Sequence, residues 1–232
     1  SLHDALPIFD GTLLNSKHKI SQKTNDIIRI VASVKQIPVI LVSARMPKGI
    51  LFLQKELNIN EPIICYSGAL VIDEKANILS NNGIATSDAL QAYSFAKELN
   101  VHMSLYKDDE WYIEELDEWA KQESEITNIS PKITSFTDLF NQWECENSGP
   151  NKILCMGKPN DIKLLDAKIK SVHSNDLNVY PSKPTYLEIM PNSISKTSAI
   201  EILMRKFSIQ KSEIIAVEIG RASCRERVYG EC

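Results

Sequence analysis

Four short polar stretches each sit where an apolar run ends or a helix begins, and together they could hold an anion. They are Asp10-Gly11-Thr12, Ser43-Ala44-Arg45, Ser67-Gly68 and Lys196. The carboxyl ends of parallel strands meet at one edge of a sheet, where open α/β sheets bind their ligands. Loop amides, a helix N-terminus and a lysine all favour a phosphate group, because they offset its negative charge. Each stretch alone is a common turn, cap or surface residue, so the hypothesis depends on their order and placement.

The elements that would position these residues alternate between strand and helix. Buried strands are predicted to end at Phe9, over 39–42 and over 63–66, and a hairpin is predicted over 69–79. Ser21 is predicted to cap a helix reaching Val34, and Pro47 to open the next helix. The first of these helices has apolar residues at core spacing, namely Ile27, Ile28, Val31 and Val34.

This alternation of strands and helices predicts an α/β fold with a Rossmann-like parallel sheet and helices on both faces. It changes near Gly83, so residues 83–184 are predicted to form an inserted α/β cap domain, and the core to comprise 1–82 and 185–232. The core is expected to resume with a strand over 186–190, a helix over 196–207 capped by Ser195, and a strand over 213–217. The tryptophans of the insertion, Trp111, Trp119 and Trp143, are interpreted as packing residues.

Composition restricts the possible functions. The 232 residues carry a net charge of −4, which does not favour nucleic-acid binding. No apolar run approaches the ~20 residues of a membrane span. The five scattered cysteines form no Cys-x-x-Cys pair, so we expect a reducing, cytoplasmic setting. The four histidines lack metal-ligand spacing and are interpreted as surface or turn residues; they are His3, His18, His102 and His173.

The motifs at 10–14, 43–45, 63–69 and 187–196 resemble those of the haloacid dehalogenase superfamily, over about residues 9–217. More specifically, they resemble its Cof-type phosphatases, which carry a large α/β cap. The resemblance implies Mg²⁺-dependent hydrolysis of small phosphate monoesters, often phosphosugars, through an aspartyl-phosphate. A small phosphorylated metabolite is then the expected partner, with no nucleic acid and no membrane.

The resemblance also implies roles for individual residues. Asp10 would be the general acid/base, and its backbone carbonyl would contact the metal. Ser43, Gly11 and Thr12 would bind the phosphate, Lys196 would neutralise it, and Arg45 would support the loop.

Two positions depart from the family pattern. Ile8 stands where the nucleophilic aspartate belongs, and Ile219 where a metal-binding aspartate belongs. An aliphatic side chain can neither attack phosphorus nor bind a metal ion, so we expect the chain as written to be inactive. Residues 1–8 and 218–232 are interpreted as non-native ends, with a naturally inactive member as the alternative. A non-catalytic phosphate-ligand binder and a phosphomutase or sugar-phosphate phosphatase relative remain open.

Overall fold

The computed structural model describes residues 13–14, 19–173 and 175–217, and these form two compact units. The first unit comprises the described parts of Ser1–Ser80 and Ser195–Cys232, and the second is Asn81–Ile194. Each unit has its own sheet and its own apolar core. Within the described ranges, no helix combines the length and the apolar character needed to cross a bilayer.

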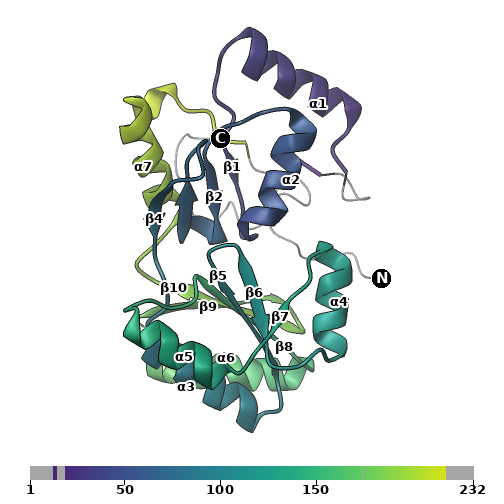
Figure 1. The fold of residues 1–232 in the computed structure, drawn as a ribbon, viewed down its shortest axis with the longest axis vertical. Coiled ribbons are helices and arrows are strands. Elements are labelled where there is room, and N and C mark those ends of the chain that lie inside the picture. The colour runs from purple at the N-terminus through teal and green to yellow at the C-terminus, as the bar shows by residue number, and fades with distance from the viewer. Residues whose placement is uncertain (1–12, 15–18, 174, 218–232) are drawn as a thin grey trace. The chain divides into compact units, whose positions relative to one another are not determined.

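The first unit is built on a four-stranded sheet in the order β1-β2-β3-β4 (Figure 1). Its strands are β1 (Leu41–Val42), β2 (Ile63–Cys65), β3 (Leu70–Ile72) and β4 (Ile78–Asn81). β1 and β2 are parallel, with Leu41 opposite Ile63, and β2 pairs with β3 in the antiparallel sense. The predicted hairpin is therefore confirmed as β3 and β4. Asp73 orders its turn by accepting hydrogen bonds from the backbone N–H groups of residues 75 and 77.

Helices α2 (Pro47–Leu57) and α7 (Lys196–Phe207) lie on opposite sides of this sheet (Figure 1). Ala199 and Leu203 of α7 pack against Ile64 and Val71, which are cross-strand partners and share one face. Ser195 caps α7 through a capping box with Ser198. The sequence prediction for this helix, residues 196–207 behind a Ser195 cap, is confirmed.

The helix predicted over 21–34 forms, but it is not buried as its spacing suggested. Ser21 caps α1 (Gln22–Arg29), which continues as a π-helical segment over Ile30–Val34. Ile27 is 51% exposed and Val34 is 69% exposed. Helical periodicity shows only that a stripe could be buried, because burial also needs a neighbouring element to cover that stripe.

The strand predicted over 213–217 is wrong. A short 3₁₀ turn covers Lys211–Glu213, and the following apolar run is not part of a sheet. Ile215 is 90% exposed in this segment. A strand needs a neighbour to complete its backbone hydrogen bonds, and no described strand pairs with this one.

The second unit has a six-stranded sheet in the order β7-β6-β5-β8-β10-β9, whose strands are labelled in Figure 1. The strands are β5 (His102–Lys107), β6 (Glu110–Ile113), β7 (Lys132–Ile133), β8 (Lys152–Met156), β9 (Leu177–Lys183) and β10 (Tyr186–Pro191). All neighbours are antiparallel except β6 and β7, which are parallel. The helices are α3 (Thr86–Glu98), α4 (Glu118–Thr127), α5 (Phe136–Cys145) and α6 (Pro159–His173).

Three of these helices cover one face of the sheet and form its apolar core. α5 contributes Phe136, Leu139, Phe140 and Trp143, while α3 and α6 add small and aliphatic residues. Burying an aliphatic or aromatic side chain of this kind stabilises a fold by about 1.5–3 kcal/mol. Trp111 and Trp143 are 2% exposed, so their interpretation as packing residues is confirmed.

The strand over 186–191 corrects the expected boundary at residue 185. The sequence pattern places this strand in the core with 185–232, but Glu188 of β10 pairs with Leu154 of β8 and Tyr180 of β9. The second unit accordingly reaches Ile194. An apolar strand with alternating character fits several sheets, and the register with its neighbours decides which sheet it joins.

Candidate functional site

Three of the four predicted stretches meet in the first unit. The backbone N–H of Ser67 donates to the Ser43 carbonyl at 2.8 Å, and that of Tyr66 donates to the Arg45 carbonyl at 3.2 Å. These two hydrogen bonds join the segment after β1 to the segment after β2. The parallel pairing of β1 and β2 explains the contact, because it brings both carboxyl ends to one edge.

Ser43 is fully buried at this edge. Its backbone N–H donates to the Ile64 carbonyl at 2.9 Å, so the residue continues the β1–β2 ladder. Its hydroxyl oxygen accepts a hydrogen bond from the Arg45 backbone N–H at 3.1 Å. A serine hydroxyl can donate one proton as well as accept, which leaves Ser43 able to donate to an anion.

The segment after β2 has an unusual backbone. Tyr66 and Ser67 have φ angles of 49° and 54°, and Gly68 has a φ of 114°. Non-glycine residues in this left-handed region cost free energy and are found where the surrounding structure imposes them, often at functional sites. Tyr66 is fully buried, so packing holds the turn in place.

Gly68 joins this turn to the start of α7. A Cβ built on Gly68 would lie 2.5 Å from the Ser195 carbonyl oxygen and 3.3 Å from the Lys196 nitrogen. Lys196 is the first residue of α7 and is half-buried. The N-terminus of a helix carries a partial positive charge and exposes amide donors. The edge thus combines a hydroxyl, a helix N-terminus and a lysine, which is the donor set that the sequence predicted for an anion.

The remaining predicted residues lie outside the described part of the chain. They are Asp10, Gly11 and Thr12, together with the departures at Ile8 and Ile219. Among the described residues, no group of three or more His, Cys, Asp or Glu side chains could hold a metal ion. Magnesium prefers carboxylate oxygens. The described residues therefore supply no carboxylate set that fits this ion.

The two described histidines were predicted to be surface or turn residues, but their side chains are buried, with exposures of 4% for His102 and 7% for His173. His102 Nδ1 lies 2.8 Å from Asp117 Oδ2 and its Nε2 lies 2.9 Å from the Ser104 hydroxyl. Burial lowers the pKa of His102 below its ordinary value, although Asp117 acts in the opposite direction. His173 lies 3.7 Å from Asp88. The alternation of His102 with Met103 was the signal in the sequence that could have placed His102 within a strand. In a strand the two side chains lie on opposite faces of the sheet.

A second missed feature is a buried ion pair in the second unit. Lys152 Nζ lies 2.8 Å from Glu188 Oε2, with side-chain exposures of 12% and 5%. Burial alone would raise the pKa of Glu188, but the Lys152 charge and several hydrogen bonds outweigh it and lower the pKa.

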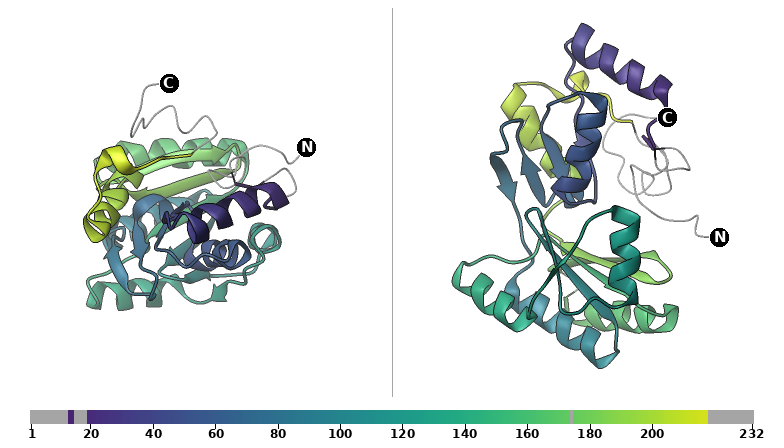
Figure 2. Two further views of the ribbon diagram at one scale, coloured as in Figure 1. Left: turned by 90° about the horizontal axis from the view of Figure 1, so that it is seen from above. Right: turned by 45° about the vertical axis from the view of Figure 1, so that its right-hand side comes forward.

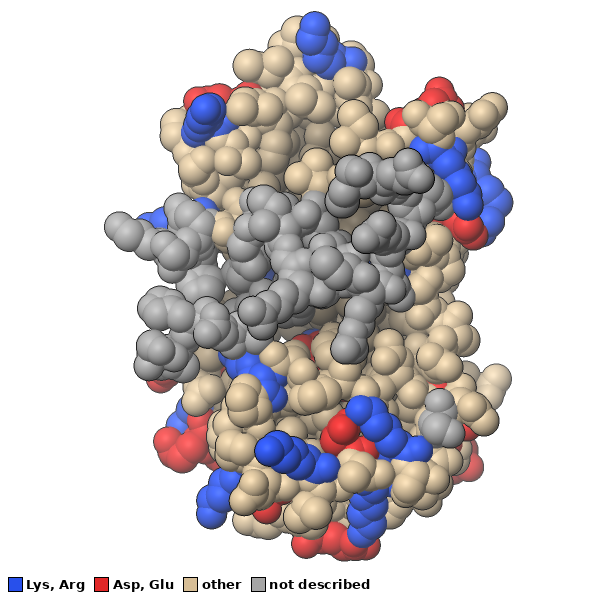
Figure 3. All heavy atoms as spheres, turned by 180° about the vertical axis from the view of Figure 1, so that it is seen from behind, with Lys and Arg blue, Asp and Glu red and all other residues tan. Residues whose placement is uncertain are grey.

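On the part of the second unit visible in Figure 3, acidic and basic side chains are interspersed rather than gathered by sign.

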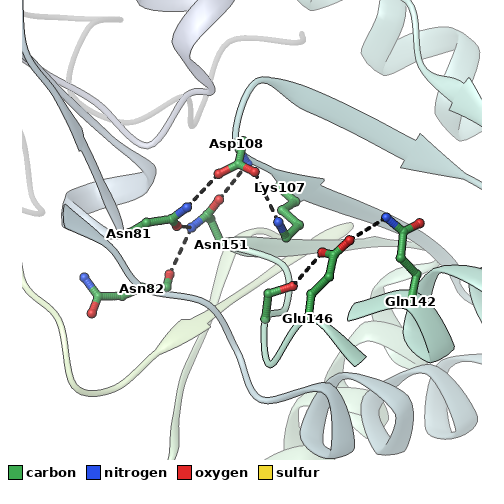
Figure 4. A network of polar contacts seen from close by, with 8 residues as sticks. Asn81, Asn82, Lys107, Asp108, Gln142, Glu146 and Asn151 are labelled. Atoms are coloured by element: carbon green, nitrogen blue, oxygen red, sulfur yellow. Dashed lines mark hydrogen bonds and ion pairs between the residues drawn. The ribbon is translucent and has the colours of Figure 1, made fainter. Parts of the chain in front are cut away.

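A third missed feature is a closed ring of polar contacts around Asn151 (Figure 4). Asn151 is fully buried; its Oδ1 accepts from the Asp108 N–H at 2.7 Å, and its Nδ2 donates to Asn81 Oδ1 at 2.6 Å. Nδ2 also donates to the Asn82 carbonyl at 3.0 Å, and Asn81 donates to Asp108 at 2.7 Å. The ring fastens the chain entering the second unit to the β5–β6 turn.

Fold and site together define an α/β protein of two units, with a candidate anion-binding edge on the first. A profile of the haloacid dehalogenase-like hydrolases matches residues 9–217, and the chain belongs to this family. Within it the chain is of the Cof type, a group of phosphatases.

Individual relatives support this assignment. A Haemophilus influenzae protein named as a candidate phosphatase is 28% identical over 210 residues, covering 90% of this chain and 76% of the relative. The crystal structure of TM0651 from Thermotoga maritima is 28% identical with a TM-score of 0.76, covering 89% and 75%. The subclass IIB sugar phosphatase BT4131 shares the fold at 17% identity, with a TM-score of 0.69 and coverage of 88% and 75%.

Proposed function

We propose that the first unit binds the phosphate group of a small phosphorylated metabolite, a sugar phosphate by preference. The observation that carries this proposal is the joining of three loops at one edge, through the Ser43–Ser67 hydrogen bond and the contact of Gly68 with Ser195. These loops supply the Ser43 hydroxyl, the amides at the start of α7 and the Lys196 ammonium. A phosphate dianion gains most from donors of this kind, because charged hydrogen bonds are the stronger ones.

The family chemistry is hydrolysis of phosphate monoesters, and we propose Mg²⁺-dependent hydrolysis through an aspartyl-phosphate for a form of this chain with aspartates at positions 8 and 219. Asp10 would serve as its general acid/base. The chain as written carries Ile8 and Ile219 at the positions of the nucleophile and a metal-binding aspartate. We therefore expect it to bind phosphate esters with little or no turnover. The sugar-phosphate preference is supported by the name of BT4131, a sugar phosphatase with the same fold.

The second candidate function is a non-catalytic binder of phosphorylated ligands. It is favoured by the same pair of departures, because Ser43 and Lys196 remain while the nucleophile does not. Activity and binding must consequently be measured separately. A phosphomutase or sugar-phosphate phosphatase relative would differ only in its product, which requires a repaired chain.

Binding is tested by calorimetry with inorganic phosphate and a hexose 6-phosphate, with and without Mg²⁺. Lys196→Ala should weaken binding by at least about tenfold, since it removes a charged partner of the anion. Lys206→Ala is the matched control, because Lys206 lies in the last turn of the same helix and pairs with Asp73 and Glu74. Absence of binding to either ligand, or equal losses in both variants, would contradict the proposed site.

Turnover is tested with p-nitrophenyl phosphate and Mg²⁺. The chain as written should release phosphate at the background rate, and Ile8→Asp alone should not restore full activity. The double variant Ile8→Asp with Ile219→Asp should exceed either single variant if these positions are the missing carboxylates. Turnover by the unmodified chain at rates typical of enzymes, ~1–10³ s⁻¹, would refute the expected inactivity without affecting the binding proposal.

A further inference from the structure

Helix α4 differs from the other helices of the second unit in what it buries. Its buried residues are Ala120 and Glu123, whereas α5 buries four large apolar side chains. Within the described part of the unit, no residue of α4 belongs to the apolar cluster that α3, α5 and α6 build. Figures 1 and 2 show α4 standing apart from that layer of helices.

The sheet face beneath α4 carries polar side chains beside apolar ones, since the buried Met156 and Leu154 of β8 stand opposite Tyr186 and Glu188. Leu187 and Ile189 of β10 point into the apolar cluster, so Tyr186 and Glu188, which alternate with them, face the other side. The same alternation on β5 sets Met103 in the cluster and His102 on the opposite face. α4 bonds to Tyr186 and its cap bonds to His102, so it covers the face that the other helices leave uncovered.

Side-chain hydrogen bonds hold α4 to this face. Asp117, the N-cap of α4, accepts a hydrogen bond from Ala120 and contacts His102 Nδ1 at 2.8 Å. Gln122 Nε2 donates to the Tyr186 hydroxyl at 2.9 Å, and that hydroxyl donates to Glu123 Oε2 at 3.2 Å. Polar groups such as these regain hydrogen bonds from water when a contact opens, whereas buried apolar surface does not.

Opening would also relieve an electrostatic cost. Burial raises the pKa of Glu123 above its ordinary value, so its carboxylate is disfavoured in the closed position. Glu114 stays tied to α5 through the Phe136 N–H, so movement would start after it: residues 115–116 are exposed, and Asn128 ends the helix in the left-handed conformation at a φ of 54°.

We propose that α4 is a lid that undocks from the face of the six-stranded sheet opposite the apolar cluster, while α3, α5 and α6 remain packed. Undocking breaks the contacts to Tyr186 and His102 and admits water to Tyr186, Ser104 and the Lys152–Glu188 pair. It leaves the apolar cluster intact. Regions with few buried apolar contacts are those that open at the lowest free energy in native proteins.

Amide hydrogen exchange of the full chain under native conditions tests this lid. Amides in the middle of α4, residues 122–126, should exchange at least about tenfold faster than those in the middle of α5 and α6. Tyr186→Phe should accelerate α4 by about a further tenfold, as expected for lost hydrogen bonds, and leave α5 and α6 unchanged. Gln122→Ala, which leaves the sheet untouched, should act in the same direction.

Tyr180→Phe is the control. Tyr180 lies on the neighbouring strand β9 and donates to Glu188 at 3.0 Å rather than to α4. It should leave the exchange of α4 relative to α5 as in the unmodified chain. Equal exchange rates in α4, α5 and α6, or a uniform acceleration of all helices by Tyr186→Phe, would overturn the proposal.

Discussion

Gly68 lies so close to Ser195 that a Cβ on residue 68 would sit 2.5 Å from the Ser195 carbonyl oxygen. Real Cβ atoms do not approach backbone oxygen this closely, and a φ of 114° is strained for any other residue. The contact holds the turn after β2 against the start of α7. It therefore ties the folding of the first unit to the geometry of the candidate phosphate site.

Gly68→Ala should accordingly destabilise the first unit by about 1–3 kcal/mol, because it combines backbone strain with a steric clash. Phosphate affinity should fall in parallel, since the start of α7 must move. Urea denaturation and phosphate calorimetry measure the two effects. Gly49→Ala is the control: Gly49 lies within α2, where an added Cβ meets only the Arg45 side chain at 3.4 Å. It should be neutral or stabilising, and a larger loss at Gly49 than at Gly68 would contradict this explanation.

The Asn151 ring should be essential for the second unit. Asn151→Ala removes the side chain that bonds the half-buried Asp108 N–H and Asn82 carbonyl, and losing such a partner costs about 1–3 kcal/mol for each group left unsatisfied. The free energy of unfolding, measured by urea denaturation, should fall by at least that much. Asn141→Ala serves as the control because Asn141 is exposed on α5. Equal stabilities for the two variants would show that the ring contributes nothing.

His102 makes stability depend on pH near neutrality. Its pKa is lowered in the folded state, mainly by burial, so the unfolded chain takes up a proton first as the pH falls below about 6.5. The unfolded state then binds more protons than the native state. The contribution of His102 to the free energy of unfolding should therefore be constant above that pH. Below it the free energy of unfolding should decline by no more than about 1.4 kcal/mol per unit of pH.

Chemical denaturation at several pH values between 5 and 7.5, compared with the variant His102→Gln, measures this dependence. Glutamine does not titrate, so the variant should show a flatter profile in that range. A variant with the same slope as the unmodified chain would assign the pH dependence to other groups.

The sequence predicted local features better than partnerships between distant segments. The hairpin after β2 and the capped helix α7 are determined by nearby residues, Asp73 and Ser195, and both were predicted. The sheet that Tyr186–Pro191 joins was not, because an alternating strand fits more than one set of neighbours. The partners of His102 and Glu188 were missed for the same reason, since a single sequence contains no record of what lies across a sheet.

The candidate site follows the same division. Strand ends and a helix start predicted that the segments after β1 and β2 and the start of α7 would meet, and they do so around Ser43, Gly68 and Ser195. The left-handed turn at Tyr66 and Ser67 was not predictable. Neither residue type favours that conformation, and only the packing of the finished unit imposes it.

The Lys152–Glu188 pair offers the sharpest electrostatic test in the second unit. In the unmodified chain the pKa of Glu188 is lowered by Lys152 and by hydrogen bonds, against the effect of burial. This contribution to stability is present above the unfolded pKa of about 4.3 and is lost as the pH falls. Lys152→Met removes the partner and leaves a carboxylate that is 5% exposed without a counter-charge, which should cost about 3–5 kcal/mol at neutral pH.

The pH dependence due to Glu188 should also reverse in Lys152→Met. The folded-state pKa of Glu188 then exceeds the unfolded value, so stability falls as the pH rises above about 4.3. Adding Glu188→Gln removes the charge but keeps an acceptor for the Tyr180 hydroxyl. In the unmodified chain that hydroxyl donates to Glu188 at 3.0 Å. The double variant should recover most of the lost stability in urea denaturation. A double variant no more stable than Lys152→Met would mean that the ammonium acts through packing rather than through its charge.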